Sequence, residues 1–339
     1  MITFSRGNNA ALPFRKNKFI FSILISGLLA SSSALAADYP ERPINLIVPY
    51  TAGGDADMSA RTLAKELDEK IPKPIVVQNK GGAGGLIGSS FVHKSEADGY
   101  TLLLARVGSQ AILPALLKNK QYEWDEFTFL GVLDINPMVC VVNQNSPFTS
   151  LESLIDHMKA NPGALSYSTT GPATSLNLAA QTLFSSADLP KDIATEIPYK
   201  GGGEATAAVL AQDVDFSCNN MASLLSNISG GRLRALVTTS PNRLKQLPEV
   251  PTAAELGHPK LEGVNGWSAL YGPADLPNNV VDYWEENLQY LMDSESWKSA
   301  LEAAGSIPRV LIGVEAANFI EGQYNFYSDL GTALGLEID

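Results

Sequence analysis

The sequence predicts an α/β fold with two largely parallel sheets, and three observations support this prediction. Short apolar runs bounded by proline or glycine, such as residues 43–50 and 74–79, are typical of buried strands. Longer stretches, such as residues 58–71, carry apolar residues near helical spacing with charges between them. Hydrophobic residues make up 45% of the 339 residues and charged residues 18%, which is a globular balance. Strand–helix alternation over this length implies parallel sheets, and the number of strands suggests two of them.

The first part of the chain alternates in this way up to about residue 105. The first strand is followed by the polar break 51–57, and the helix after it is stopped by Pro72. A Gly-rich turn, GGAGG, separates the next strand from its helix. The expected strands are 43–50, 74–79 and 100–105, and the expected helices are 58–71 and 86–94.

The same order recurs beyond residue 137. The expected strands are 138–142, 164–168, 194–199, 213–218 and 233–239, and the expected helices are 151–160, 176–184, 204–211 and 221–225. The sequence contains no internal repeat, no low-complexity tract and no Pro/Gly/Ser-rich linker between its halves. Two sheets without such a linker indicate a chain that crosses between two lobes.

The first 36 residues are predicted to be a cleaved secretory signal peptide. Four basic residues and no acidic residue accompany the apolar run 19–30, and small residues ending in Ala34-Leu35-Ala36 follow it. Spanning a bilayer takes about 20 apolar residues, and this run is shorter. We therefore expect cleavage after Ala36 and a soluble, exported mature chain, with a retained membrane anchor as the alternative.

The charge balance excludes one large class of function. The chain carries 24 Lys and Arg residues against 36 Asp and Glu residues, a net charge of -12. Removal of the four basic residues of the signal peptide leaves a net charge of -16. A nucleic-acid-binding protein needs a basic face to neutralise phosphates, so no nucleic-acid partner is expected.

Two cysteines are too few for a disulfide-rich scaffold or a cysteine-based zinc cluster. Cys140 and Cys218 lie in predicted strands, and an oxidising compartment would permit them to pair. The sequence does not show that they lie close together. The interpretation favoured here is two buried thiols.

Motifs for catalysis and for cofactors are missing from the sequence. It contains no P-loop, no H-E-x-x-H zinc motif and no G-x-S-x-G nucleophile elbow. The run GGAGGLIG resembles a dinucleotide loop, but Ile87 stands where the third glycine belongs. The sequence therefore predicts a protein that is not an enzyme and that uses no cofactor and no metal.

Polar loops follow several of the predicted strands. They are the segments 51–57, 106–110, 168–175 and 200–203, to which Asn219 and Asn220 add a fifth. Glycines let backbone amides approach a ligand, hydroxyl groups donate hydrogen bonds, and helix N-termini attract negative charge. Because ligands of open α/β sheets bind beyond the carboxyl ends of strands, these loops predict a cradle for a carboxylate or a phosphate. Asp57 and the two asparagines could instead serve only to cap helices.

Several segments resemble the substrate-binding proteins of tripartite tricarboxylate transporters, often called Bug proteins. The segments that carry the resemblance are YPERPINLIVPYTAGGDADMSARTLAKEL, PIVVQNKGGAGGLIG, ADGYTLLLA, ALSYSTTGPATSLNLAA, IPYKGGGEATAAVLAQDVDF, GRLRALVTTSPNRLKQLPEVPTAAELG and GWSALYGPADLP. The resemblance extends from Tyr39 to the C-terminus. It implies a two-lobed periplasmic binding protein of type II, with two mixed or parallel sheets, helices on both faces and a ligand cleft between the lobes. The implied lobes are residues 38–137 with 264–339, and residues 138–263.

The resemblance also implies which loops hold the ligand. In such proteins two loops of the first lobe bind one ligand carboxylate through backbone amides and ordered waters, and loops of the second lobe close over it. The residues expected to contact the ligand are Tyr50, Thr51, Ala52, Gly53, Gly54, Asp57, Arg106, Ser109, Ser168, Thr169, Thr170, Ser175, Tyr199, Lys200, Gly201, Asn219 and Asn220.

This chain departs from the family pattern at a few positions. Arg106 stands where the family usually has a small residue, and Tyr50 stands where phenylalanine is common. A guanidinium directly after a buried strand suits a carboxylate, so we expect Arg106 to pair with an anionic group of the ligand.

The expected function is that of a periplasmic, monomeric receptor that captures a small carboxylate. A dicarboxylate or an aromatic carboxylate is favoured, and the receptor would deliver it to the membrane permease subunits of a tripartite tricarboxylate transporter. The alternative is a periplasmic sensing component that presents a bound organic acid to a membrane sensor kinase.

Overall fold

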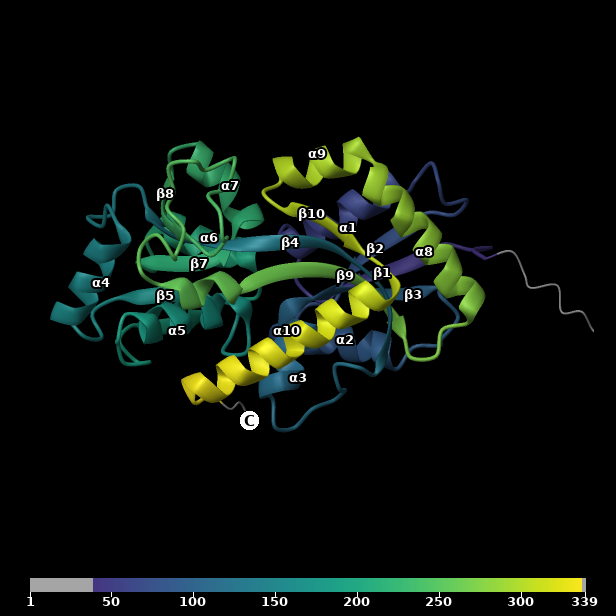
Figure 1. The fold of residues 1–339 in the computed structure, drawn as a ribbon, viewed down its shortest axis with the longest axis horizontal. Coiled ribbons are helices and arrows are strands. Elements are labelled where there is room, and N and C mark those ends of the chain that lie inside the picture. The colour runs from purple at the N-terminus through teal and green to yellow at the C-terminus, as the bar shows by residue number, and fades with distance from the viewer. Residues whose placement is uncertain (1–38, 337–339) are drawn as a thin grey trace, which may run out of the picture. The chain divides into compact units, whose positions relative to one another are not determined.

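Ten strands lie within residues 39–336, the residues that this computed structural model describes, and form two sheets that share one long strand and so make one continuous strand order (Figure 1). Their order is β2-β1-β3-β9-β4-β7-β5-β6, and β8 and β10 also pair with β4. The predicted signal peptide, residues 1–36, lies outside the described residues. Within residues 39–336, no helix is both long enough and apolar enough to cross a bilayer.

The long strand β4 (Phe127–Asn143) connects two groups of strands, and Figure 1 shows it running beside β9 through the middle of the fold. Residues 127–137 of β4 pair antiparallel with β9 (Asn265–Pro273), and part of this stretch also pairs with β10 (Ile307–Leu311). Residues 138–143 pair with β7 (Phe216–Asn220) and β8 (Leu233–Thr238). The partners of β4 therefore change between Pro137 and Met138.

The first group of strands contains the parallel set β2-β1-β3, and β3 pairs antiparallel with β9. Its elements are β1 (Ile44–Val48), α1 (Asp55–Glu66), β2 (Ile75–Asn79), η1 (Ala83–Gly85), α2 (Leu86–His93), β3 (Thr101–Arg106), the π-helical turn η2 (Gly108–Ile112) and α3 (Leu113–Leu116). The C-terminal segment adds α8 (Asn278–Asp293), α9 (Glu295–Ala303) and α10 (Gly313–Leu334).

The second group contains the parallel set β6-β5-β7, next to the end of β4. Its elements are α4 (Leu151–Ala160), β5 (Ser166–Thr169), α5 (Ser175–Ser186), β6 (Thr195–Pro198), α6 (Gly202–Ala211), α7 (Met221–Ser229) and the short helix η3 (Pro259–Gly263). The predicted α/β fold with two sheets is confirmed. Both sheets are mixed, because β4 runs antiparallel to its neighbours in each.

Helices cover both faces of the first sheet, and β3 shows how its sequence allows this. Successive side chains of a strand point to opposite faces. Leu102 and Leu104 belong to the buried cluster that α1, α8 and α9 complete, whereas Leu103 and Ala105 belong to the cluster that α10 completes. Strand β3 is therefore apolar throughout, as a strand covered on both faces must be.

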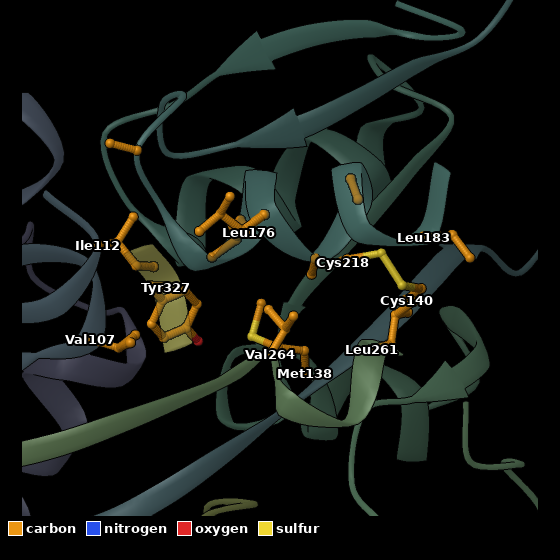
Figure 2. Close-up of a cluster of buried hydrophobic side chains, with 14 of the residues drawn as sticks. Val107, Ile112, Met138, Cys140, Leu176, Leu183, Cys218, Leu261, Val264 and Tyr327 are labelled. Carbon is orange, nitrogen blue, oxygen red and sulfur yellow. A yellow bond between two sulfur atoms is a disulfide. The ribbon is translucent and has the colours of Figure 1, made fainter. Parts of the chain in front are cut away.

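Cys140 and Cys218 form a disulfide, and the prediction of two free thiols is wrong (Figure 2). They lie directly opposite each other on the antiparallel strands β4 and β7, and neither is exposed. The two cysteines are 78 positions apart, and local sequence patterns do not show that β4 and β7 are neighbours. The disulfide is part of the large core cluster that Leu176, Leu183 and Tyr327 also join.

Candidate functional site

Four helix N-termini meet at one small pocket of about 30 Å³. The N-cap residues of α1, α5, α6 and α7 are Gly54, Thr174, Gly201 and Asn220, and all four line it. The full lining is Tyr50, Thr51, Gly54, Asp55, Arg106, Val107, Gly108, Thr170, Thr174, Ser175, Leu176, Gly201, Gly202 and Asn220. Residues that lie far apart in sequence thus meet where strands end and helices begin.

None of these four N-cap residues caps its helix with its own side chain. By contrast, Ser150 at the start of α4 accepts a hydrogen bond from the backbone N–H of Ser153. The first-turn N–H groups of a helix have no partner within the helix, and the helix dipole places positive potential there. Four such ends around one pocket make it suited to a negatively charged group.

Loop 51–54 and loop 201–203 pack closely against each other. A Cβ atom added to Gly201 would lie 2.5 Å from Oγ1 of Thr51, and one added to Gly203 would lie 3.4 Å from the carbonyl oxygen of Gly53. Glycine at position 201 is therefore required by space, because the side chain of Thr51 leaves no room for a second side chain there. The same close approach brings the starts of α1 and α6 together.

Asp57 shapes its own loop and does not line the pocket. Its Oδ2 accepts hydrogen bonds from the backbone N–H of Gly53, at 3.0 Å, and from Nε of Arg61, at 3.0 Å. Burial alone would raise the pKa of Asp57, but the bonds from Arg61 and Gly53 lower it below the ordinary value. Asp57 lies in the first turn of α1, whose N-cap is Gly54, so the alternative that Asp57 caps this helix is wrong. Its carboxylate holds the loop before the helix instead.

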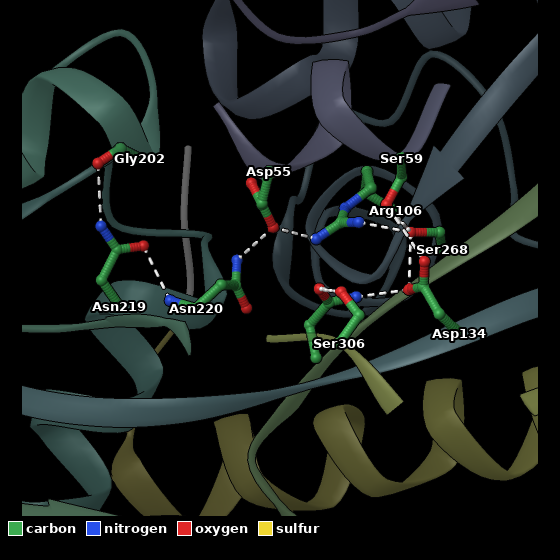
Figure 3. Close-up of polar contacts among 10 residues, drawn as sticks. Asp55, Ser59, Arg106, Asp134, Gly202, Asn219, Asn220, Ser268 and Ser306 are labelled. Atoms are coloured by element: carbon green, nitrogen blue, oxygen red, sulfur yellow. Dashed lines mark hydrogen bonds and ion pairs between the residues drawn. The ribbon is translucent and has the colours of Figure 1, made fainter. Parts of the chain in front are cut away.

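Arg106 is buried, with 4% of its side chain exposed, and it already has partners within the chain (Figure 3). Its guanidinium forms an ion pair with Asp55 and donates a hydrogen bond to Oγ of Ser268. The expectation that Arg106 pairs with an anionic group of the ligand stays a prediction. Its fixed partner, Asp55, was not predicted.

The contacts of Arg106 continue to the strands β4 and β9. Oγ of Ser268, on β9, donates to Oδ1 of Asp134, on β4, at 2.8 Å, and Oγ of Ser59 donates to Oδ2 of Asp134 at 3.0 Å. Complete burial raises the pKa of Asp134, and Arg106 and these hydroxyl groups offset only part of that rise. A buried polar chain thus links the pocket to the two strands that connect the groups of the sheet (Figure 3).

Asn220 extends this chain to the second group of strands. Its Nδ2 donates to Oδ2 of Asp55 at 2.7 Å, whereas its Oδ1 is buried without a partner among the described residues. The neighbouring Asn219 points elsewhere: its Nδ2 donates to the carbonyl oxygen of Gly202 at 2.9 Å. Asn220 therefore faces the pocket, and Asn219 holds the start of α6.

Tyr50 lines the pocket, and its hydroxyl is already hydrogen-bonded within the chain. The hydroxyl donates to the carbonyl oxygen of Gly84 at 2.8 Å. A Cβ atom on Gly108 would lie 2.5 Å from the hydroxyl oxygen of Tyr50, so the absence of a side chain at position 108 makes room for the tyrosine. Burial raises the pKa of Tyr50, and the hydroxyl therefore stays protonated and acts as a donor.

The predicted site residues divide into two sets. Those that line the pocket are Tyr50, Thr51, Gly54, Arg106, Thr170, Ser175, Gly201 and Asn220. Those that do not line it are Ala52, Gly53, Asp57, Ser109, Ser168, Thr169, Tyr199, Lys200 and Asn219. The structure adds Asp55, Val107, Gly108, Thr174, Leu176 and Gly202.

Several members of the second set have clear structural tasks. Oγ of Ser168 donates to the carbonyl oxygen of Ala205 at 2.9 Å, and Oγ1 of Thr169 donates to Glu196 at 2.6 Å. Lys200 is exposed. All six additions, Asp55 included, directly adjoin predicted residues in the sequence. Their contact with a ligand stays a prediction.

Comparisons with known proteins agree with this architecture. Residues 59–336 match the family described as "Tripartite tricarboxylate transporter family receptor". The chain is 31% identical to protein BugT of Bordetella pertussis, over 93% of this chain and 98% of that protein. It is similar to the structure of the periplasmic binding protein BugD, with a TM-score of 0.83, 30% identity and coverage of 89% and 100%. A protein of R. palustris with adipate, Rpa4515, gives a TM-score of 0.84 at 25% identity, with the same coverage.

Proposed function

Since the chain belongs to the tripartite tricarboxylate transporter receptor family, whose members are periplasmic solute-binding proteins and not enzymes, we propose that it captures a small organic acid and delivers it to the permease subunits of such a transporter. Export by the predicted signal peptide is part of this proposal.

The observation that carries the proposal is the meeting of four uncapped helix N-termini at one pocket. A carboxylate placed there would accept hydrogen bonds from first-turn backbone amides and would lie in the positive potential of several helix dipoles. Arg106 forms bonds to Asp55 and Ser268, and a guanidinium has five N–H donors, so it retains donors for a ligand.

Ligand entry requires the loops to separate. A volume of about 30 Å³ suits one or two waters and not an organic acid. We propose that residues 38–137 with 264–339 form one lobe and residues 138–263 the other, and that the strands β4 and β9 act as the hinge. The change of partners along β4 between Pro137 and Met138 supports this division.

The acid favoured here is a dicarboxylate or an aromatic carboxylate. Val107 and Leu176 give the lining two apolar side chains, which suit the carbon skeleton of such an acid. The R. palustris relative with adipate supports the dicarboxylate class.

The test is a thermal-shift screen of the chain from residue 37 onward against mono- and dicarboxylates, aromatic acids, amino acids and matched neutral amides. A ligand at a hundred times its Kd stabilises the folded state by about 2.7 kcal/mol, which raises the Tm by roughly 4 °C for a chain of this size. A shift with acids and none with the matched amides is expected. Shifts with the amides alone would contradict the proposal. Hits are confirmed by calorimetric titration.

A further inference from the structure

We propose that Asp55 determines which acid is bound: a carboxylate that also carries a hydrogen-bond donor, an ammonium or hydroxyl group, next to the carboxylate. This inference rests on the proposed function and narrows it. It predicts that amino acids and hydroxy acids are preferred to unsubstituted acids of the same skeleton.

The first argument concerns the charge of the pocket. Asp55 and Arg106 are the only charged residues in its lining, and they form an ion pair with each other. The pair leaves the lining without net charge. An unsubstituted dicarboxylate would then place its charge beside that of Asp55 and have no second guanidinium to balance it. An ammonium group on the ligand removes this conflict.

The second argument concerns the free acceptor capacity of Asp55. The guanidinium of Arg106 and Nδ2 of Asn220 both donate to the same oxygen, Oδ2 (Figure 3). Oδ1 has no hydrogen-bond partner within residues 39–336, yet it is not one of the fully enclosed unpaired atoms there. A carboxylate oxygen can only accept a hydrogen bond, so a ligand group that pairs with Oδ1 of Asp55 must be a donor.

The third argument concerns what an acid without a donor would lose. Closing the lobes over such an acid would leave a carboxylate oxygen in the closed pocket without a partner on the ligand, which is unfavourable. A hydrogen bond from the ligand to a charged group typically changes affinity by about 10- to 100-fold. Sites built around a buried polar partner reject analogues that lack the matching group for the same reason.

Asp55 could alternatively serve only to hold Arg106 and Asn220 in place. In that case replacing Asp55 would weaken the binding of every acid by a similar factor. If Asp55 contacts the ligand donor, its replacement changes the ratio between matched acids. The ratio therefore separates a role in specificity from a role in structure.

The experiment measures Kd by calorimetric titration for three matched series: succinate, malate and aspartate; glutarate and glutamate; benzoate, salicylate and anthranilate. The series cover chain length and ring, and within each series only the donor varies. Wild type is compared with Asp55→Asn. The matched control is Glu204→Gln, which removes an exposed carboxylate from the first turn of α6 outside the pocket lining.

In wild type and Glu204→Gln, the best donor-bearing acid is expected to bind at least 10-fold more tightly than its unsubstituted analogue. The ammonium of aspartate is expected to exceed the hydroxyl of malate, because it also neutralises Asp55, whereas the uncharged amine of anthranilate acts only as a hydrogen-bond donor. In Asp55→Asn the preference should fall to within about threefold, with the unsubstituted dicarboxylates gaining affinity.

Two results would overturn the inference. One is that wild type binds unsubstituted acids as tightly as their donor-bearing analogues, and the other is that Asp55→Asn retains the wild-type ratio. Either result leaves the proposed function intact, because acids still bind. If no acid of any series binds wild type, the proposed function fails and the inference fails with it. Circular dichroism and the Tm of each variant verify that it is folded.

Discussion

Replacing Arg106 by glutamine should destabilise the fold, and replacing Asp55 by asparagine in the same chain should restore part of the loss. Both side chains are nearly buried, with 4% of Arg106 and 10% of Asp55 exposed. Removing one partner of a buried ion pair leaves the other as an uncompensated charge. Removing both charges leaves two amides, which can still hydrogen-bond to each other.

The expected magnitudes follow from the contacts of each residue. Arg106→Gln leaves Asp55 without its cation and also removes the positive charge that acts on Asp134, so the expected loss is about 3–5 kcal/mol. Asp55→Asn leaves Arg106 near Asp134, and the expected loss is only about 1–2 kcal/mol. Each kcal/mol shifts the Tm of a chain of about 300 residues by roughly 1.5 °C, so Arg106→Gln should lower it by roughly 5–8 °C.

The assay is urea unfolding of wild type, both single variants and the double variant at pH 7. The four free energies of unfolding form a double-mutant cycle, which gives the coupling energy between Arg106 and Asp55. The control is Arg61→Gln on α1, whose side chain is 57% exposed and which should cost less than about 1 kcal/mol. A double variant less stable than Arg106→Gln alone would refute the argument. The uncompensated charge of Asp55 would then not be the cause of the loss of stability in Arg106→Gln.

Three further predictions concern other parts of the structure. Gly201→Ala should weaken ligand binding at least tenfold through its clash with Thr51, and adding Thr51→Ala should recover most of the affinity; no recovery in a titration would contradict the close-approach argument. Reducing the Cys140–Cys218 disulfide should lower the free energy of unfolding by up to about 4.5 kcal/mol for a 78-residue loop. In the same urea assay, reductant should not change the stability of the control variant in which Cys140 and Cys218 are both replaced by alanine. Because burial raises the pKa of Asp134, the folded chain retains a proton that the unfolded chain releases above about pH 4, so this group lowers stability as pH rises through its folded-state pKa. The stability of Asp134→Asn relative to wild type should therefore increase between about pH 4 and pH 7 in urea titrations, and a constant difference would show that Asp134 is not responsible.

Local sequence patterns were sufficient to predict most strands and helices. Helix 151–160 was predicted with the bounds that α4 has, and every strand predicted between residues 43 and 239 overlaps an observed strand. The spacing of apolar residues and the breaks at proline and glycine are local properties, so a single sequence contains them. The helix predicted over 58–71 is observed as α1, Asp55–Glu66, because Asp55 already takes the first helical position after the N-cap Gly54.

Pairings between distant residues could not be predicted in this way. The antiparallel pairing of β4 with β7 brings Cys140 opposite Cys218, and neither strand indicates its partner by composition. The hydrogen bond between Asn220 and Asp55 spans 165 positions. Such contacts depend on the order of strands in the sheet, which propensity and periodicity do not determine.

The choice between Asp55 and Asp57 shows where local reasoning ends. Successive residues of a helix are about 100° apart, so two carboxylates separated by two positions point roughly 200° apart and cannot both face the same pocket. Because α1 begins at Asp55, only one of the two carboxylates can lie in the site, whereas the predicted helix over 58–71 left both in a loop. Deciding which one required their partners: Arg61 lies one turn along the same helix and holds Asp57, whereas Arg106 and Asn220 come from other strands and hold Asp55 at the pocket. The assignment of Asp57 to the ligand followed the family resemblance, and the tertiary contacts place Asp55, not Asp57, at the pocket.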